Sequence, residues 1–480
     1  MLHFLASWPL DRYVYIVEWI VRIIMLLVLM GRRQHRSNLT WLLVVFFLPV
    51  PGMILYLLIG QNRLPSRRAS RYAKLLESFD VVRKRFEDHP STTSLNLAPE
   101  FASTGQFVEK LGNLSIVKGN DNEIIIDTDH MIDRLVEDID NAKEHVHMLY
   151  YIFVNDETGR RVAEALARAV QRGVTCRVLV DAVGSKALFK RLGPEMIKQG
   201  IQLHAALPVN LFRRRMARID LRNHRKLAII DGRIAYSGSQ NIVNADYGKK
   251  NLAWHDMSVR STGPIVLQLQ AVFIGDWYFE TDEILDTEKA LPDPTETGTS
   301  IAQTLPSGPD YPTENYQRIV VTALYGAQEQ VTITSPYFVP DESFMQAMEV
   351  AVLRGVKVDL ILPQKCDQIL VGAASRSYYD ELLDLGVNLY LYEPGLLHAK
   401  TLSVDDQIAL IGSSNFDIRS FALNFEISLI FYGSDMADRL RTIQKEYLEN
   451  SKLLTQETWQ GRGWWAERFE NIAKMLSPLL

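Results

Sequence analysis

Hydrophobic and polar positions divide the chain into an apolar N-terminal part and a longer part in which short apolar segments alternate with amphipathic ones. Two apolar runs come first, Tyr13 to Met30 and Leu39 to Ile59. The first run is long enough to cross a bilayer as a helix. Pro49, Pro51 and Gly52 interrupt the second run, so we expect its helix to kink or break there.

Basic residues flank the second run on both sides, in the loop from Gly31 to Asn38 and again after Ile59. Because basic flanks favour the cytoplasmic side, a single full crossing would leave one flank on the wrong side. Two interpretations stay open: a two-helix transmembrane hairpin, or one crossing followed by a broken, re-entrant segment. Glu18 and Arg22 lie four residues apart in the first run and share one helix face. The longer basic flank after Ile59 places the main body, and with it any active site, in the cytoplasm.

The rest of the chain predicts strands that alternate with helices, and the pattern occurs twice. The hinges Arg172-Gly173-Val174 and Arg354-Gly355-Val356 match almost letter for letter, and glycine suits the left-handed position that closes a helix. The first copy is expected as strand 147–154, helix 160–171 and strand 175–180, and the second as strand 331–339, helix 342–353 and strand 357–362. We predict an α/β protein of two like-folded halves packed face to face, preceded by the N-terminal transmembrane or re-entrant hairpin.

The expected domains follow from these patterns. They are a membrane-anchoring hairpin (1–72), a first half (107–285), a linker rich in Pro, Thr, Ser and Gly (286–312), and a second half with an amphipathic C-terminal tail (313–480). A net charge of -5 over 480 residues gives no global reason to expect a nucleic-acid partner. The only two cysteines, Cys176 and Cys366, are too far apart in sequence for a zinc site of the usual spacing.

Each predicted half carries the same set of polar residues. A histidine and a lysine stand at i and i+2, so on a strand they point to the same side. An aspartate follows the histidine by seven residues, and a Gly-Ser-x-Asn segment comes after it on a returning strand. The first set is His224, Lys226, Asp231, Ser239 and Asn241, and the second set is His398, Lys400, Asp405, Ser413 and Asn415.

These residue types suit chemistry on a phosphate group. Lysine supplies positive charge, serine and asparagine supply hydrogen bonds, and histidine can act as nucleophile or as acid and base near neutral pH. Asp256 and Glu426 follow the two sets, and we expect each to bind one imidazole nitrogen and leave the other free to attack. Asp231 and Asp405 belong to the candidate catalytic motif, but their place at tight turns indicates a structural role.

The doubled pattern H-x-K-x4-D followed by G-S-x-N resembles the phospholipase D superfamily. The resemblance implies two-step phosphoryl transfer through a phosphohistidine, with no metal and no other cofactor. It implies one histidine as nucleophile and the other as acid and base. We expect His224 to attack and His398 to move the proton, although the two motifs are nearly symmetric.

Within that superfamily the chain is most similar to the bacterial cardiolipin synthases. This likeness covers the apolar N-terminal pair and segments around both motifs: 221–226, 412–417, Arg419-Ser420, Asn424, Glu426 and 476–480. It implies that one phosphatidylglycerol donates its phosphatidyl group to another, giving cardiolipin and glycerol at the bacterial cytoplasmic (inner) membrane. A hydrolytic phospholipase D, a phosphatidylserine synthase and a nuclease share the motifs, and an inactive scaffold is the alternative of another class.

Several further features carry weaker expectations. The cluster Arg213, Arg214, Arg215, Arg218 and Arg222 is expected to contact anionic lipid headgroups. Trp459, Trp464 and Trp465 fit either a membrane interface or packing of the last helix. Tyr151 and Tyr337 are expected on strands, with Tyr337 at the edge of the pocket, and His255 near the site. The sequence leaves open whether the chain forms a homo-oligomer.

Overall fold

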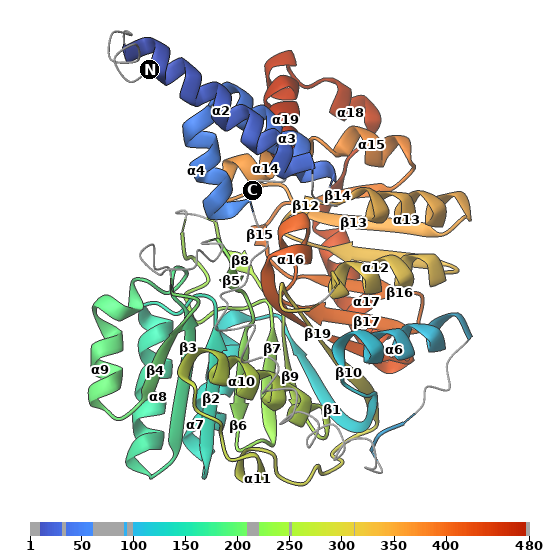
Figure 1. Cartoon of the computed structure of the whole chain (residues 1–480). Helices are drawn as coiled ribbons and strands as arrows, with labels where there is room; N and C mark the ends of the chain where they lie inside the picture. The colour runs from blue at the N-terminus through green and yellow to red at the C-terminus, as the bar shows by residue number, and fades with distance from the viewer. Residues whose placement is uncertain are drawn as a thin grey trace.

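The structure is a computed structural model, and it describes residues 10–30, 35–60, 91–93, 99–208, 220–248, 252–311 and 313–476. Two α/β halves form the body, and the N-terminal helices project from one end of it (Figure 1). The N-terminal helices are α2 (Leu10–Met30), α3 (His35–Phe47) and α4 (Pro49–Ile59). Among the described residues one helix, over Arg12–Met30, is long and apolar enough to cross a membrane.

The second apolar run is broken, as its prolines predict. Helix α3 ends at Phe47, and Leu48 leaves the helical conformation with φ -129° and ψ 73°. The rings of Trp41 and Tyr56 then meet at 5.3 Å, edge to face. Fifteen residues of straight helix would hold these rings about 22 Å apart, so α3 and α4 fold back on each other.

The first half begins with α6 and places its helices around a mixed sheet. Its elements are α6 (Pro99–Gly112), β1 (Val117–Ile125), α7 (Thr128–Asn141), β2 (His145–Tyr150), α8 (Glu157–Gln171), β3 (Thr175–Asp181), the short 3-10 helix η1 (Leu188–Lys190), α9 (Leu192–Lys198), β4 (Gln202–Ala206), β5 (Arg222–Asn223), β6 (Leu227–Ile230), β7 (Ile234–Gly238), β8 (Trp254–His255), β9 (Ser258–Thr262), α10 (Ile265–Thr281) and α11 (Thr287–Ala290).

The second half repeats this order and adds two C-terminal helices. Its elements are β10 (Ser300–Ser307), α12 (Asn315–Gly326), β11 (Gln330–Thr334), β12 (Phe338–Val339), α13 (Glu342–Leu353), β13 (Lys357–Pro363), α14 (Ile369–Arg376), α15 (Tyr379–Asp384), β14 (Asn388–Tyr392), β15 (Leu396–Leu397), β16 (Thr401–Val404), β17 (Ile408–Gly412), β18 (Phe416–Asp417), α16 (Ile418–Ala422), β19 (Asn424–Tyr432), α17 (Ser434–Glu449), β20 (Ser451–Leu453), α18 (Gln456–Gln460) and α19 (Trp464–Leu476).

The repeat that the sequence predicts is present in the sheet. The order β6-β2-β3-β4 in the first half matches β16-β11-β13-β14 in the second, with β2, β3 and β4 parallel to one another like β11, β13 and β14. Gly173 and Gly355 close α8 and α13 at φ 91° and 88°, as the two matching hinges indicate. One cluster of buried residues includes side chains of both halves, so the halves share a core.

The segment 286–312, expected to be a linker, contains a central strand. Strand β10 pairs antiparallel with β1 on one side and with β19 on the other, and it thereby joins the two halves into one sheet. Its polar composition hides it, although residues 302–307 are buried and the Gln303 side chain is bonded on both sides. The Gln303 amide donates to the Leu114 carbonyl oxygen at 2.7 Å, and the Tyr432 hydroxyl donates to the Gln303 amide oxygen at 2.7 Å.

Candidate active site

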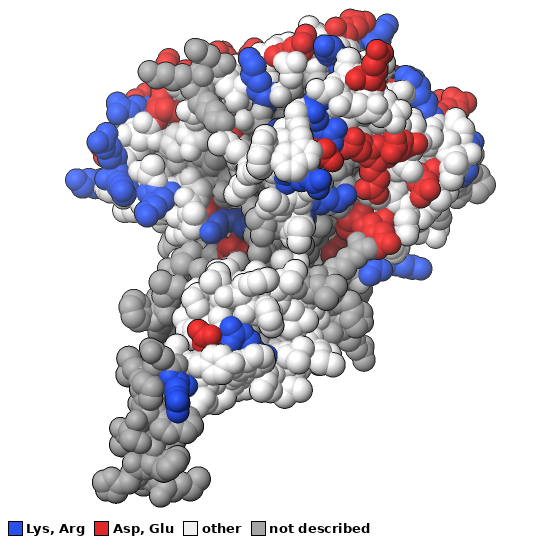
Figure 2. All heavy atoms as spheres, turned by 90° about the horizontal axis from the view of Figure 1, so that it is seen from above, with Lys and Arg blue, Asp and Glu red and all other residues white. Residues whose placement is uncertain are grey.

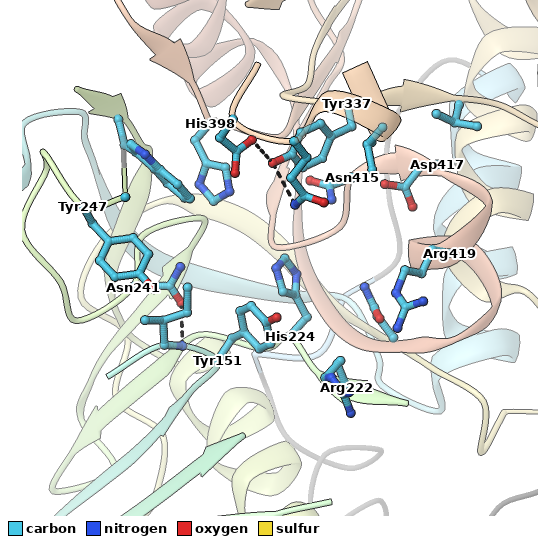
Figure 3. Close-up of a pocket in the computed structure, with 18 of the residues that line it drawn as sticks. Tyr151, Arg222, His224, Asn241, Tyr247, Tyr337, His398, Asn415, Asp417 and Arg419 are labelled. Carbon is cyan, nitrogen blue, oxygen red and sulfur yellow. Dashed lines mark hydrogen bonds between the residues drawn. The ribbon is translucent and has the colours of Figure 1, made fainter. Parts of the chain in front are cut away.

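Short strands between the halves position the two motif histidines. Strand β5 pairs with β19 of the other half, and β15 pairs with β8, so each histidine follows a strand that is bound to the opposite half. The His224 amide donates to the Phe425 carbonyl at 2.8 Å, and the His398 amide donates to the His255 carbonyl at 2.8 Å. Both imidazoles enter the same space from opposite sides (Figure 3).

Each imidazole binds a carboxylate of the opposite half. The Nδ1 atom of His224 lies 3.0 Å from Glu426 Oε2, and Nδ1 of His398 lies 2.6 Å from Asp256 Oδ1. The sequence points to both carboxylates but does not indicate that the pairs cross between the halves. An ionised carboxylate only accepts hydrogen bonds, so Nδ1 carries the proton and the Nε2 lone pair of each ring is free.

Ser239 and Ser413 stand behind the carboxylates instead of facing the cavity. Their hydroxyls donate to Asp256 at 2.5 Å and to Glu426 at 2.6 Å, and each also accepts a backbone N–H. The expected serine hydrogen bonds to phosphate are therefore replaced by bonds that hold the carboxylates in place. Asn241 and Asn415 do line the cavity, where Asn241 Oδ1 accepts the Ile152 N–H at 3.0 Å.

The two motif lysines are buried next to the histidines. The Lys226 ammonium donates to the carbonyl oxygen of His224 at 2.6 Å, and the Lys400 ammonium donates to that of His398. Burial lowers the pKa of Lys226 to about 8 and that of Lys400 to about 7, although Glu426 and Asp256 act in the opposite direction. Their charge is therefore held in a region of low polarity, where it acts strongly on an anion.

The histidine and carboxylate pKa values have the same physical origin. Burial lowers the pKa of His224, and burial together with the Lys400 charge lowers that of His398 to about 4, despite the paired carboxylates. Burial alone would raise the pKa of Asp256 and Glu426, but the paired imidazoles and the lysines outweigh it and both lie below their ordinary values. At neutral pH the rings are neutral and the carboxylates ionised, which leaves both Nε2 atoms available as nucleophile or base.

A cavity of about 520 Å³ opens in front of the two histidines. Sequence reasoning named Tyr337 as a pocket-edge residue, and it lines this cavity. Tyr151, which was expected on a strand and not at the pocket, lines it too, with its ring 4.8 Å from that of His224. Further lining residues that the sequence did not single out as site residues include Trp254, Tyr247, Asp417 and Arg419. Arg419 could have been predicted as a site residue, because it lies in a segment that resembles the cardiolipin synthases.

The motif aspartates lie away from the cavity, at the far ends of β6 and β16. The Asp231 carboxylate accepts the backbone N–H groups of residues 143–145 at 2.8 to 2.9 Å, and Asp405 accepts those of residues 328–330 at the same distances. Each aspartate follows its histidine by seven positions of chain that include a four-residue strand, a separation of about 20 Å if the chain is extended. Both therefore anchor the loop before β2 or β11, and neither can take part in catalysis directly.

The remaining expectations have mixed outcomes. His255 does not line the cavity, and its Nδ1 atom forms a hydrogen bond with Tyr392 Oη at 2.7 Å. Trp459 packs on Tyr379 at 5.0 Å, whereas Trp464 and Trp465 are 55% and 79% exposed. Of the expected arginine cluster, residues 213–218 lie outside the described residues, and Arg222 lines the cavity.

Two like-folded α/β halves that share one cavity lined by paired histidines define the phospholipase D-like class. The family model described as cardiolipin synthase, PLD-like domain, matches residues 135–277 and 320–447, and one described as phospholipase D-nuclease N-terminal matches 19–61. Cardiolipin synthase A of Pectobacterium carotovorum is 36% identical over 94% of this chain and 95% of its own. Cardiolipin synthase A of Edwardsiella ictaluri is 38% identical over the same shares.

The chain therefore belongs to the cardiolipin synthase family, and with it to the phosphatidyltransferases of the phospholipase D superfamily. Among solved structures, phosphatidylserine synthase of Haemophilus influenzae matches with a TM-score of 0.59 over 78% of this chain and 97% of that one. At 14% identity this likeness shows a common fold.

Proposed function

We propose that the protein joins two phosphatidylglycerol molecules into cardiolipin and releases glycerol. The observation that carries this proposal is the pair of neutral imidazoles, each held through Nδ1 by a carboxylate of the other half and each facing one cavity. Such a pair can divide the transfer into two displacements at phosphorus. Membership of the family indicates cardiolipin as the product, and the geometry of the site supports a reaction in two displacements.

In the first displacement the Nε2 lone pair of His224 attacks the phosphorus of the donor lipid. The N–P bond forms as the bond from phosphorus to the glycerol oxygen breaks, and His398 gives its proton to that oxygen. Binding of the anionic phosphate favours protonated His398, because an opposite charge nearby raises an imidazole pKa. His224 receives the nucleophilic role because its side chain is 12% exposed, against 6% for His398.

In the second displacement a terminal glycerol hydroxyl of another phosphatidylglycerol attacks the phosphohistidine. His398 takes the hydroxyl proton while the new O–P bond forms and the N–P bond breaks, which restores free His224 and the protonated His398 with which the first displacement began. Lys226, Lys400 and the two asparagines stabilise the charge on the phosphate oxygens in both steps. The aspartates Asp231 and Asp405 keep the motif strands in place.

The direct test supplies the purified full chain with phosphatidylglycerol alone and measures cardiolipin and free glycerol. Equal amounts of the two support the proposal, and phosphatidic acid as the main product contradicts it, because water would then be the acceptor. The variants His224→Ala and His398→Ala should both lose turnover. After rapid mixing, His398→Ala should retain a phosphorylated peptide that contains His224, whereas phosphorylation of His398 in His224→Ala would reverse the assigned roles.

We also propose that α2 makes the only crossing within the described N-terminal helices, and that α3 and α4 re-enter the membrane from the cytoplasmic side. Helix α4 has 11 residues and is about 16 Å long, roughly half of a hydrocarbon core. The fold-back at Leu48 returns the chain to the side from which α3 entered. Both basic flanks of the second run then lie on one side, which removes the conflict that a second full crossing creates.

The end of the molecule that carries the N-terminal helices exposes many apolar side chains. The N-terminal helices form an almost uncharged projection (Figure 2), and α14 and α19 lie at the same end of the molecule (Figure 1). Helix α19 buries Glu470, which binds Arg376 at 2.8 Å, and exposes apolar side chains instead. The exposed fractions are 79% for Trp465, 42% for Phe469, 57% for Ile472 and 62% for Met475. This inverted pattern supports contact of α19 with the membrane interface.

A further inference from the structure

The repeat makes the two histidines nearly equivalent, but one pair of equivalent segments near them is chemically different in the two halves. Each segment leads from the third strand of its half, β3 or β13, into the next helix. After β13 the segment is apolar where it begins α14, with Ile369 70% and Leu370 45% exposed and Val371 lining the catalytic cavity. After β3 the equivalent segment carries Lys186, Lys190 and Arg191. The apolar segment therefore contributes to the lining of the catalytic cavity, whereas the three cations of the basic segment lie outside that lining.

The basic segment lines a second cavity of about 590 Å³. Its lining includes Lys186, Lys190 and Arg191, all exposed, and Tyr247, which also lines the catalytic cavity. Among the residues that the structure describes, none forms an ion pair or a side-chain hydrogen bond with these three cations. The arginines of the neighbouring helix α8 differ in this respect: Arg161 and Arg168, for example, bind Asp133 and Asp140.

One aromatic ring separates the second cavity from His224. Gly184 lines the second cavity, and a Cβ atom added to it would stand 2.8 Å from the Tyr151 ring, so this glycine packs directly on Tyr151. The same ring lies 4.8 Å from the ring of His224. The second cavity, which the three cations line, thus reaches the ring that packs on His224.

The proposed reaction involves a second anionic group that these cations could bind, the phosphate of the acceptor lipid. The proposed reaction places one phosphate between the two histidines, whereas condensation of two phosphatidylglycerols brings two phosphates together. The acceptor's own phosphate is esterified at one end of its glycerol, and the attacking hydroxyl is at the other end. The acceptor's phosphate must therefore lie one three-carbon bridge away from the phosphorus under attack. A cationic cavity one aromatic ring away from His224 meets this requirement.

On the basis of the proposed function, we infer that the cavity of Lys186, Lys190 and Arg191 binds the phosphate of the acceptor lipid during the second displacement. The cations hold the acceptor through its phosphodiester and orient its terminal hydroxyl toward the phosphohistidine. Water and free glycerol lack that phosphate and gain nothing from the cavity. The cavity thus favours condensation to cardiolipin over hydrolysis or glycerol exchange.

The test separates the two displacements in one enzyme. Exchange of labelled glycerol into phosphatidylglycerol needs the donor site and both histidines but no acceptor phosphate, whereas cardiolipin formation needs all three. In the variant Lys190→Ala/Arg191→Ala we expect the exchange rate to stay within about twofold of the wild type. We expect cardiolipin formation at limiting phosphatidylglycerol to fall about tenfold or more, so that labelled phosphatidylglycerol makes up a larger share of the products.

The control variant is Lys365→Ala, which removes an exposed cation from the equivalent segment of the second half, outside both cavities. It should leave both rates unchanged, and Lys190→Arg should retain cardiolipin formation. Equal loss of exchange and condensation in the double variant would overturn the inference, because the cations would then serve the donor or the fold. Unchanged condensation would overturn it too. A wild-type enzyme that exchanges glycerol but makes no cardiolipin would instead contradict the proposed function.

Discussion

At the scale of single residues, the crossed pairs make each half depend on the other for its reactive histidine. Asp256→Asn keeps the shape of the side chain but lets the amide stabilise the wrong imidazole tautomer of His398. We predict that turnover falls by about 10³- to 10⁴-fold, as in enzymes in which a carboxylate orients a catalytic histidine. Steady-state cardiolipin formation by the purified variant measures the loss, and Asp256→Glu should recover part of it.

Asp359→Asn is the matched control for this prediction. Asp359 is fully buried and bound to Lys357 at 2.7 Å, but it does not line the catalytic cavity. Its replacement should lower the melting temperature and leave kcat of the folded enzyme unchanged. If Asp256→Asn and Asp359→Asn had the same effect on kcat, Asp256 would be a structural residue and not a positioning one.

The pH dependence of the reaction should report the buried lysines. A lysine must be charged to stabilise the phosphate, and the lowered pKa values of about 7 and 8 mean that this charge is lost as the pH rises through that range in the free enzyme. We predict that kcat/KM falls between pH 7 and pH 9, well below the range in which an exposed lysine titrates. Initial rates at low substrate over pH 5 to 9.5 test this, and a flat profile up to pH 9.5 would contradict it.

At the scale of elements, α19 offers a test of the membrane-facing end. Trp465→Ser/Ile472→Ser removes two exposed apolar side chains and should leave the fold intact, because neither is buried. We predict that activity on long-chain phosphatidylglycerol in vesicles falls several-fold, while activity on a dispersed short-chain phosphatidylglycerol stays unchanged. The control is Leu353→Ser on α13, because Leu353 is 79% exposed, as is Trp465. Equal activity of the double variant and the wild type on vesicles would remove α19 from the membrane interface.

The elements also show where sequence reasoning succeeds and where it stops. Strands β3 and β13 and helix α13 are found where periodicity and the glycine hinges predict them, because local pattern and burial agree there. Strand β10 was missed because its sequence is polar, and its buried Gln303 side chain bonds the distant residues Leu114 and Tyr432, which no local pattern reveals. The sequence identified both histidines and both carboxylates. That each histidine binds the carboxylate of the other half depends on the strands β5 and β8, which are each only two residues long.

At the scale of the whole molecule, the doubled fold produces one site by sharing residues across the contact between the halves. Arg225, between the histidine and lysine of the first motif, pairs with Asp276 at 2.6 Å and donates to the Glu426 carbonyl at 3.0 Å. A buried cation therefore ties the first half to the strand that carries the partner of His224. Separate halves would each lack the carboxylate that orients their own histidine, so the reaction requires the joined sheet.

The membrane arrangement of the whole chain follows from the number of crossings. With one crossing by α2, the start of that helix and the body lie on opposite sides of the membrane. In a background of Cys176→Ser/Cys366→Ser, we predict that an impermeant thiol reagent labels Arg12→Cys in intact cells whose outer barrier has been opened. Lys445→Cys, on the exposed face of α17, should react only after the inner membrane is permeabilised. Leu48→Cys, at the fold-back between α3 and α4, should stay unlabelled from outside because a re-entrant segment does not emerge. Labelling of Arg12→Cys and Lys445→Cys from the same side would require a second full crossing, and the conflict between the two basic flanks would return.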